Sequence, residues 1–69
     1  MTEWYEIPIK IQRGNKEMVV PTNQVQAGDH VFYLGIKRRC DGAIPDDEEE
    51  IMYLKFGIDC WPAEMFDSE

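Results

Sequence analysis

Apolar and polar residues alternate near the start of the chain. Every second residue between positions 5 and 11 is apolar: Tyr5, Ile7, Ile9 and Ile11. A period of two in β-branched and aromatic residues predicts a half-buried strand. Pro8 has no N–H for a ladder, so we expect this strand at a sheet edge, or with the Pro8 nitrogen toward solvent. An open edge also leaves pairing into a homodimer as an alternative.

A turn and a second short strand follow. Gly14 and Asn15 both tolerate positive φ, so they predict a tight turn after which residues 18–20 return antiparallel. After Pro21, Thr22 and Asn23 are residue types that cap helices, and they predict one helical turn that runs to residue 26. Residues 27–29, Ala-Gly-Asp, predict another turn.

The middle of the chain has the strongest β pattern. Residues 30–38 are apolar on both faces, which is typical of a central strand, and Gly35 predicts a bulge or sharp bend within it. Residues 39–50 show no apolar period and are expected to form a solvated loop.

Three elements are expected after this loop. Residues 51–56 predict a strand that ends at Gly57, and residues 58–61 predict a last short strand. Pro62 at a first helical position predicts one helical turn over residues 62–66. The pattern as a whole predicts an all-β fold for residues 1–69, a single domain forming a small, five-stranded, strongly bent antiparallel barrel with one short helical turn near the C-terminus.

Two segments resemble parts of Src-homology-type small barrels, the group that includes Tudor-like and ribosomal-type modules. Residues 26–32, QAGDHVF, are similar to the Gly-Asp turn that starts a long strand in such barrels. Residues 60–66, CWPAEMF, are similar to their closing turn. The resemblance implies the barrel fold. It does not extend to proline-rich peptide binding, because Met65 stands where peptide-binding members usually carry Tyr.

Composition narrows the functional classes. The chain has 69 residues, 43% of them hydrophobic and 30% charged, which excludes a multidomain enzyme, a membrane-spanning protein and a low-complexity chain. So small a core leaves little room for a substrate cavity, and no pair of carboxylates is fixed in one cleft, so we expect no enzyme. The first residues match neither a secretory signal nor a transit peptide, and we expect a cytoplasmic protein that does not bind membranes.

Charge divides the chain into two unequal halves. The net formal charge is −7, but residues 1–40 carry six basic and four acidic residues, whereas residues 41–69 carry ten acidic residues and only Lys55. The second half should repel nucleic-acid phosphates and attract basic protein surfaces.

Five adjacent carboxylates are the most distinctive feature: Asp46, Asp47, Glu48, Glu49 and Glu50. They could dock on a basic protein surface or imitate a nucleic-acid phosphate track; alternatively, they form a solvated loop that keeps a small domain soluble. Aromatic residues outside the central strand could add an apolar contact, because aromatics dominate interface hot spots. The candidates are Trp4, which is out of phase with the first strand, together with Trp61 and Phe66.

Other groups have weaker patterns. His30, Cys40 and Cys60 lack the paired spacing of zinc ligands, so we expect no metal or cofactor, and we expect reduced thiols. The basic run 37–39 is too short for a nucleic-acid site, and we expect it to pair with the acidic loop. Direct nucleic-acid binding is therefore not expected.

Taken together, these features favour a non-enzymatic protein-binding module with an acidic surface and nearby aromatics, whose partner has a basic surface. Short acidic proteins of this kind suggest an accessory or inhibitory protein of a mobile element. The alternative is a nucleic-acid mimic that occupies the basic groove of a DNA- or RNA-handling protein.

Overall fold

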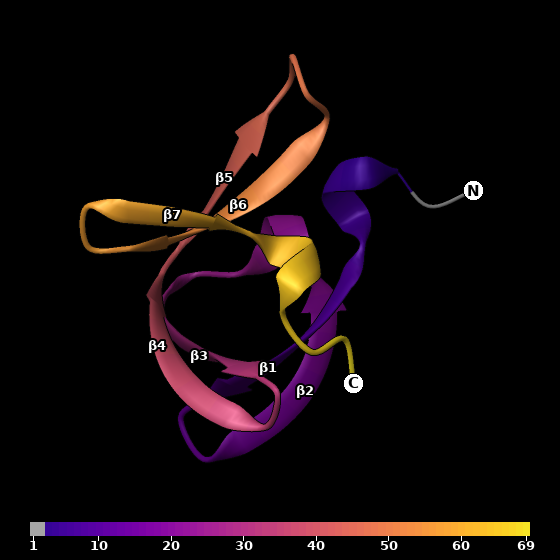
Figure 1. Ribbon diagram of the computed structural model, residues 1–69. Coiled ribbons are helices and arrows are strands. Elements are labelled where there is room, and N and C mark those ends of the chain that lie inside the picture. Colours follow the sequence, from indigo (N-terminus) through magenta and orange to yellow (C-terminus); the bar gives the residue numbers. More distant parts are fainter. Residues whose placement is uncertain (1–2) are drawn as a thin grey trace.

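Two antiparallel sheets make up the fold in the computed structural model, which describes residues 3–69 (Figure 1). The first sheet has the strand order β2-β1-β3-β4 and contains β1 (Pro8–Arg13), β2 (Lys16–Pro21), β3 (Ala27–Tyr33) and β4 (Ile36–Asp41). The second has the order β5-β6-β7 and contains β5 (Ala43–Asp46), β6 (Ile51–Phe56) and β7 (Asp59–Pro62). The helical segments of these residues are single 3-10 turns: η1 (Trp4–Glu6), η2 (Thr22–Gln24) and η3 (Ala63–Met65).

The expected β-rich antiparallel architecture is confirmed, but the five-stranded barrel is wrong. Residues 3–69 form seven strands, and the two sheets do not close on each other. The division occurs at Gly42, which has φ +119° and lies between β4 and β5. A left-handed conformation of this kind favours glycine, and it lets the chain leave the first sheet and begin a second one.

The first strand begins later than the alternation predicts. Trp4 and Tyr5 lie in η1, and Ile7 is exposed, whereas Ile9 and Ile11 are buried as expected. β1 is an interior strand between β2 and β3, so of the two expected alternatives the edge position does not apply. Pro8 is the first residue of β1 and lies where β1 pairs with β2 alone, a position at which a missing N–H is tolerated.

The long central strand expected over residues 30–38 is a hairpin. Leu34 and Gly35 have φ +51° and +82°, and the ladder from Tyr33 to Ile36 closes directly around them. Positive φ at both central residues is the pattern of a two-residue type I′ turn, whose twist matches that of the flanking strands. The turn expected over residues 27–29 is instead the start of β3, with an irregular register between Ala27 and His30.

The loop expected over residues 39–50 is largely strand. Residues 39–41 end β4, residues 43–46 form β5, and only residues 47–50 form the turn that leads to β6. β5 is an edge strand, which accommodates Pro45 opposite Met52. Strand pairing therefore makes this region more ordered than its polar composition indicates.

The core lies between the two sheets. Its largest fully buried side chains are Ile9, Ile11, Leu54, Val31, Thr22 and Cys40. Thr22 does not cap a helical turn as expected: its hydroxyl donates a hydrogen bond to the carbonyl of Ile7, and η2 has no side-chain cap. η3 begins at Ala63, one residue after Pro62.

Asp67 joins the C-terminal segment to the first sheet. Its N–H donates to the carbonyl of Phe32 at 2.8 Å, and its carbonyl accepts from the N–H of Lys10 at 3.0 Å. Its carboxylate accepts from the N–H groups of Leu34 and Gly35 at 3.2 and 2.9 Å. These bonds hold the segment after η3 beside the β3–β4 hairpin.

Candidate functional site

Charge is divided between the two sheets. Six of the seven basic residues lie on strands of the first sheet: Lys10, Arg13, Lys16, Lys37, Arg38 and Arg39. The second sheet carries Lys55 and the acidic turn, by which we mean residues 46–50. Figure 1 shows this turn at one end of the molecule and the β1–β2 and β3–β4 turns at the other. The acidic turn and most of the basic residues therefore lie on different sheets.

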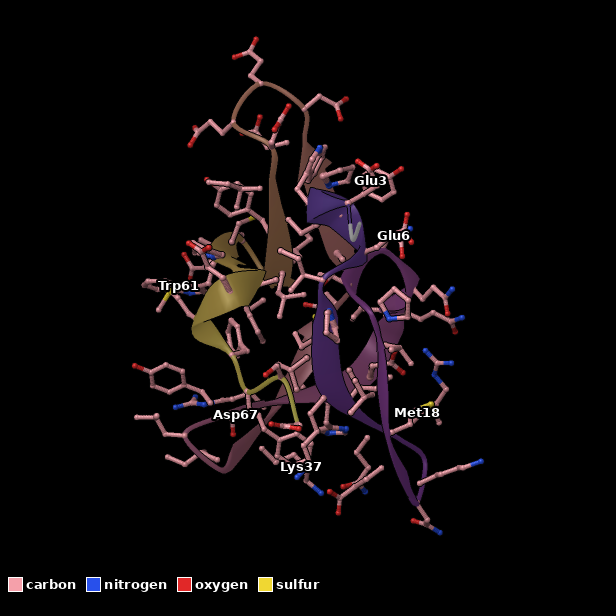
Figure 2. All side chains as sticks on the ribbon, turned by 90° about the vertical axis from the view of Figure 1, so that its right-hand side faces the viewer. Glu3, Glu6, Met18, Lys37, Trp61 and Asp67 are labelled. Atoms are coloured by element: carbon pink, nitrogen blue, oxygen red, sulfur yellow. The ribbon has the colours of Figure 1, made fainter. Side chains whose placement is uncertain are left out.

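The acidic turn is ordered by its first residue. The Asp46 carboxylate accepts hydrogen bonds from the N–H groups of Glu48 and Glu49 at 3.0 and 3.2 Å. Such a bond from an Asp to backbone two or three residues on is a common way to hold a turn. Glu50 closes the turn with φ +55°. The side chains of this turn spread into solvent, as Figure 2 shows at the top of the view.

An apolar face adjoins these carboxylates. Strand alternation places Tyr53 on the side of β6 opposite to the buried Met52 and Leu54, and Ile44 pairs directly with Tyr53 across the strands. These residues help to line a shallow hollow of about 500 Å³, which we call the outer hollow. Its lining residues are Ile44, Pro45, Asp46, Asp47, Glu48, Tyr53 and Cys60.

Desolvation and the negative charge at the outer hollow both affect the pKa of Tyr53. Desolvation raises the pKa of its phenol, and the negative charges of Glu49, Asp46 and Glu64 raise that pKa further. A neutral phenol is thus kept beside a cluster of carboxylates over a wide pH range. It offers a hydrogen-bond donor and an apolar ring next to a surface that attracts cations.

Trp61 and Phe66 lie in a different hollow. Trp61 pairs with the buried Leu54 and therefore lies on the inward-facing side of the second sheet, near its edge. Its neighbours form an open groove of about 490 Å³, which we call the aromatic groove, between the β3–β4 and β6–β7 hairpins. The lining residues are Tyr33, Arg38, Phe56, Asp59, Trp61, Met65 and Phe66. Figure 2 shows Trp61 projecting on the side of the molecule where Asp67 also lies.

Trp4 is half-buried and packs against the core. Its ring meets that of Tyr5 edge-on with centroids 5.3 Å apart. Trp4, Glu50 and Phe66 do share the lining of a third hollow of about 250 Å³. The candidate residues other than Glu49 therefore line three hollows, and Phe66 belongs to two of them.

The expected pairing of residues 37–39 with the acidic turn is wrong. Within residues 3–69, the ion pairs join Lys10 to Glu17 at 3.2 Å and Arg13 to Asp29 at 2.8 Å. Residues 37–39 lie on β4 in the first sheet, whereas the acidic turn ends a hairpin of the second sheet. Proximity in the sequence does not bring these charges together.

The two thiols have different surroundings. Cys40 is buried; its Sγ donates to the carbonyl of Gly42 at 3.1 Å, and burial raises the pKa of this thiol. Cys60 is exposed at the outer hollow. Residues 3–69 contain no group of three or more His, Cys, Asp or Glu side chains placed to hold a metal ion.

Comparison of the chain with protein-family models, with curated proteins and with solved structures gives no match. Across the part of the chain that the structure describes, no helix is both long and apolar enough to cross a membrane. The candidate site therefore depends on the geometry of its own residues.

Proposed function

We propose that this chain is a non-enzymatic protein-binding module whose outer hollow receives a basic segment of another protein. The observation that carries the proposal is the placement of three residues of the acidic turn and of Tyr53 and Ile44 around one hollow. Carboxylates would contact lysine or arginine side chains, and the apolar floor would contact a neighbouring apolar side chain. Complementary charge increases the association rate, and burial of the aromatic ring slows dissociation.

The same geometry favours binding of a basic protein segment over imitation of a nucleic acid. Two other carboxylates of the second half hold backbone groups: Asp41 accepts from the N–H of Gly57 at 2.8 Å, and Asp67 accepts from the N–H groups of the β3–β4 turn. The five adjacent carboxylates lie together at the tip of one hairpin, which is a compact cluster rather than a long row. A mimic of a phosphate track needs such a row.

Fluorescein-labelled 12-residue peptides test this proposal by fluorescence anisotropy. The first peptide is rich in lysine and contains two leucines, the second replaces the leucines with serine, and the third replaces the lysines with glutamate. We expect tightest binding of the first and none of the third. Peptide titrations followed by NMR should shift the amide signals of Ile44, Tyr53 and Cys60.

Neutralising the turn separates the electrostatic contribution. The triple variant Asp47→Asn, Glu48→Gln, Glu49→Gln should bind the first peptide about tenfold more weakly at low salt, since three exposed ion pairs contribute roughly 0.3–1 kcal/mol each. The difference should fade at high salt, where exposed charges are screened. The matched control neutralises three carboxylates elsewhere: Glu6→Gln, Glu17→Gln and Glu69→Gln. Equal weakening by both triple variants would show that net charge alone acts, and would refute a specific site.

A further inference from the structure

The aromatic groove is an open side of the hydrophobic core. Phe56 and Phe66 are partly buried against the core, with ring centroids 5.5 Å apart in a stacked arrangement. Phe66 also meets Tyr33 edge-on, with centroids 6.0 Å apart. Tyr33, Trp61 and Met65 continue this cluster outward and are 38%, 49% and 42% exposed. The gap between the two unclosed sheets thus leaves aromatic side chains half in water.

Exposed apolar residues are concentrated around this groove. Six of the nine large hydrophobic residues that are exposed lie on the β3–β4 hairpin, the β6–β7 hairpin or η3: Tyr33, Leu34, Ile36, Ile58, Trp61 and Met65. Single exposed apolar residues are normal, but Tyr33, Trp61 and Met65 line one groove together, and exposed apolar residues grouped in this way mark an interaction surface.

Two opposite charges flank the apolar floor. Arg38 on β4 and Asp59 on β7 both line the groove, and both are exposed. Neither makes an ion pair within 4.0 Å with any residue in the range 3–69. A surface that carries one positive and one negative group on either side of an apolar centre is complementary to itself under a two-fold rotation. Symmetric dimer interfaces require this property, because the same patch meets itself.

We propose that a second copy of the chain covers the aromatic groove and forms a two-fold symmetric dimer. Arg38 faces the partner's Asp59, and Asp59 faces Arg38 of the partner subunit, so each such pair forms twice. The aromatic rings pack at the centre, where interface hot spots concentrate. The second copy closes the gap that the two sheets leave open in a single chain.

The molecule has room for this interface. A standard interface covers about 800 Å² per partner, which is about one sixth of the 4777 Å² accessible surface of the chain. The outer hollow lies on the opposite face of the second sheet, because Tyr53 and Leu54 alternate across β6. The dimer therefore leaves both acidic turns free, and salt screens the repulsion between them beyond roughly 8 Å. This inference uses a different surface from the proposed function and does not depend on it.

Sedimentation equilibrium of the full chain, from about 10 µM to about 1 mM, tests the dimer by mass against the 8.1 kDa monomer. Arg38→Asp and Asp59→Arg each put like charges together twice and should weaken the dimer at least about tenfold. The double variant Arg38→Asp with Asp59→Arg restores opposite charges and should recover most of the affinity. Trp61→Ala should weaken dimer formation about thirtyfold, as expected for a tryptophan at the centre of an interface.

The controls separate the dimer from the acidic site. Glu48→Gln should leave the dimer unchanged, and circular dichroism should show every charge variant folded, because Arg38 and Asp59 are exposed. A monomer at all concentrations overturns the proposal, as does a dimer unaffected by Arg38→Asp and Trp61→Ala, or single swaps that the double variant fails to rescue. The peptide assay of the acidic turn is expected to give the same result for Arg38→Asp as for the natural chain, so failure of one proposal leaves the other intact.

Discussion

Replacing Asp29 by Asn should remove a buried anion of β3 that binds β1 and the segment preceding β3. The Asp29 carboxylate accepts from Arg13 Nε at 2.9 Å, from Arg13 Nη2 at 2.8 Å and from the N–H of Gln26 at 2.8 Å. Its side chain is 4% exposed, whereas that of Arg13 is 39% exposed. Asn has nearly the same shape, but its amide nitrogen is a donor and would face a guanidinium that has no acceptor.

The expected loss follows from these contacts. Hydrogen bonds to a charged group contribute about 1.5–3 kcal/mol each, but solvent around Arg13 reduces the ion-pair share to about 0–1 kcal/mol. Asn keeps an oxygen for the Gln26 N–H. We therefore expect a loss of about 1–3 kcal/mol from a total stability of roughly 3–10 kcal/mol for a chain of this length. The melting temperature should fall by about 4–8 °C for each kcal/mol lost.

The loss should depend on pH in a defined direction. The hydrogen bonds from Arg13 lower the pKa of Asp29, against the opposing effect of burial, and the Gln26 N–H lowers it further. A carboxyl whose pKa is lower in the folded state than in the unfolded state stabilises the fold above its unfolded pKa, near 3.9 for Asp. That contribution disappears as the pH falls through the lower, folded-state pKa. The difference between the natural chain and Asp29→Asn should thus be constant above about pH 5 and shrink in more acidic solution.

Urea unfolding followed by the fluorescence of Trp4 and Trp61 measures this difference at a series of pH values. Glu17→Gln is the matched control, because it removes one negative charge from an exposed pair with Lys10 and should cost at most about 1 kcal/mol. If Asp29→Asn costs no more than Glu17→Gln at pH 7, or if its cost is the same at pH 3, the carboxylate does not stabilise the fold as argued.

Three further predictions concern other parts of the molecule. Gly35→Val should lower the unfolding free energy by about 1–2 kcal/mol in urea titrations, because a side chain at φ +82° is strained; Gly35→Asn should cost less, and equal costs would contradict a left-handed turn. A thiol reagent should modify Cys60 in the native chain and Cys40 only in denaturant, so two rapidly reacting native thiols would disprove the burial of Cys40. Glu49→Gln should lower the pKa of Tyr53, measured from its ring signals in an NMR titration, because a negative charge near the phenol is removed; an unchanged pKa would place that charge too far away.

Local patterns predicted the strands wherever burial follows alternation. Ile9 and Ile11 are buried as their period indicates, and Met52 and Leu54 repeat this in β6. The Gly14-Asn15 turn is confirmed. In each case the local preferences of the sequence agree with the tertiary contacts, so the local pattern predicts the structure correctly.

The sequence predictions of strands were wrong where strand pairing, rather than side-chain chemistry, determines the backbone conformation. Leu34 adopts φ +51° in a two-residue turn, although leucine carries no turn preference of its own. Residues 43–46 become a strand because they pair with β6, despite Pro45 and the neighbouring acids. Such strand pairing leaves no period in a single sequence.

The candidate site shows the same limit. The sequence shows the acidic turn as a feature, but the aromatics expected beside it, Trp4, Trp61 and Phe66, are not the residues that line the outer hollow. The alternation of residues 51–56 already places Tyr53 opposite to Met52 and Leu54, so that signal was available. Ile44 was not accessible in this way, because its position beside Tyr53 depends on the β5–β6 register.

The failure of the barrel to close has a functional consequence. In a closed barrel, the face of β7 that carries Trp61 would be buried against the first sheet, and only the outer face with Tyr53 would meet other molecules. Because Gly42 starts a separate sheet, the β5–β6–β7 sheet is accessible on its outer, acidic face and also at the aromatic part of its inward face near β7. Apolar association changes little when the salt concentration is lowered. Association through carboxylates becomes stronger at low salt, because the charges are screened less. Salt dependence measured on Trp61→Ala and on the neutralised turn therefore assigns any observed binding to one face of this sheet.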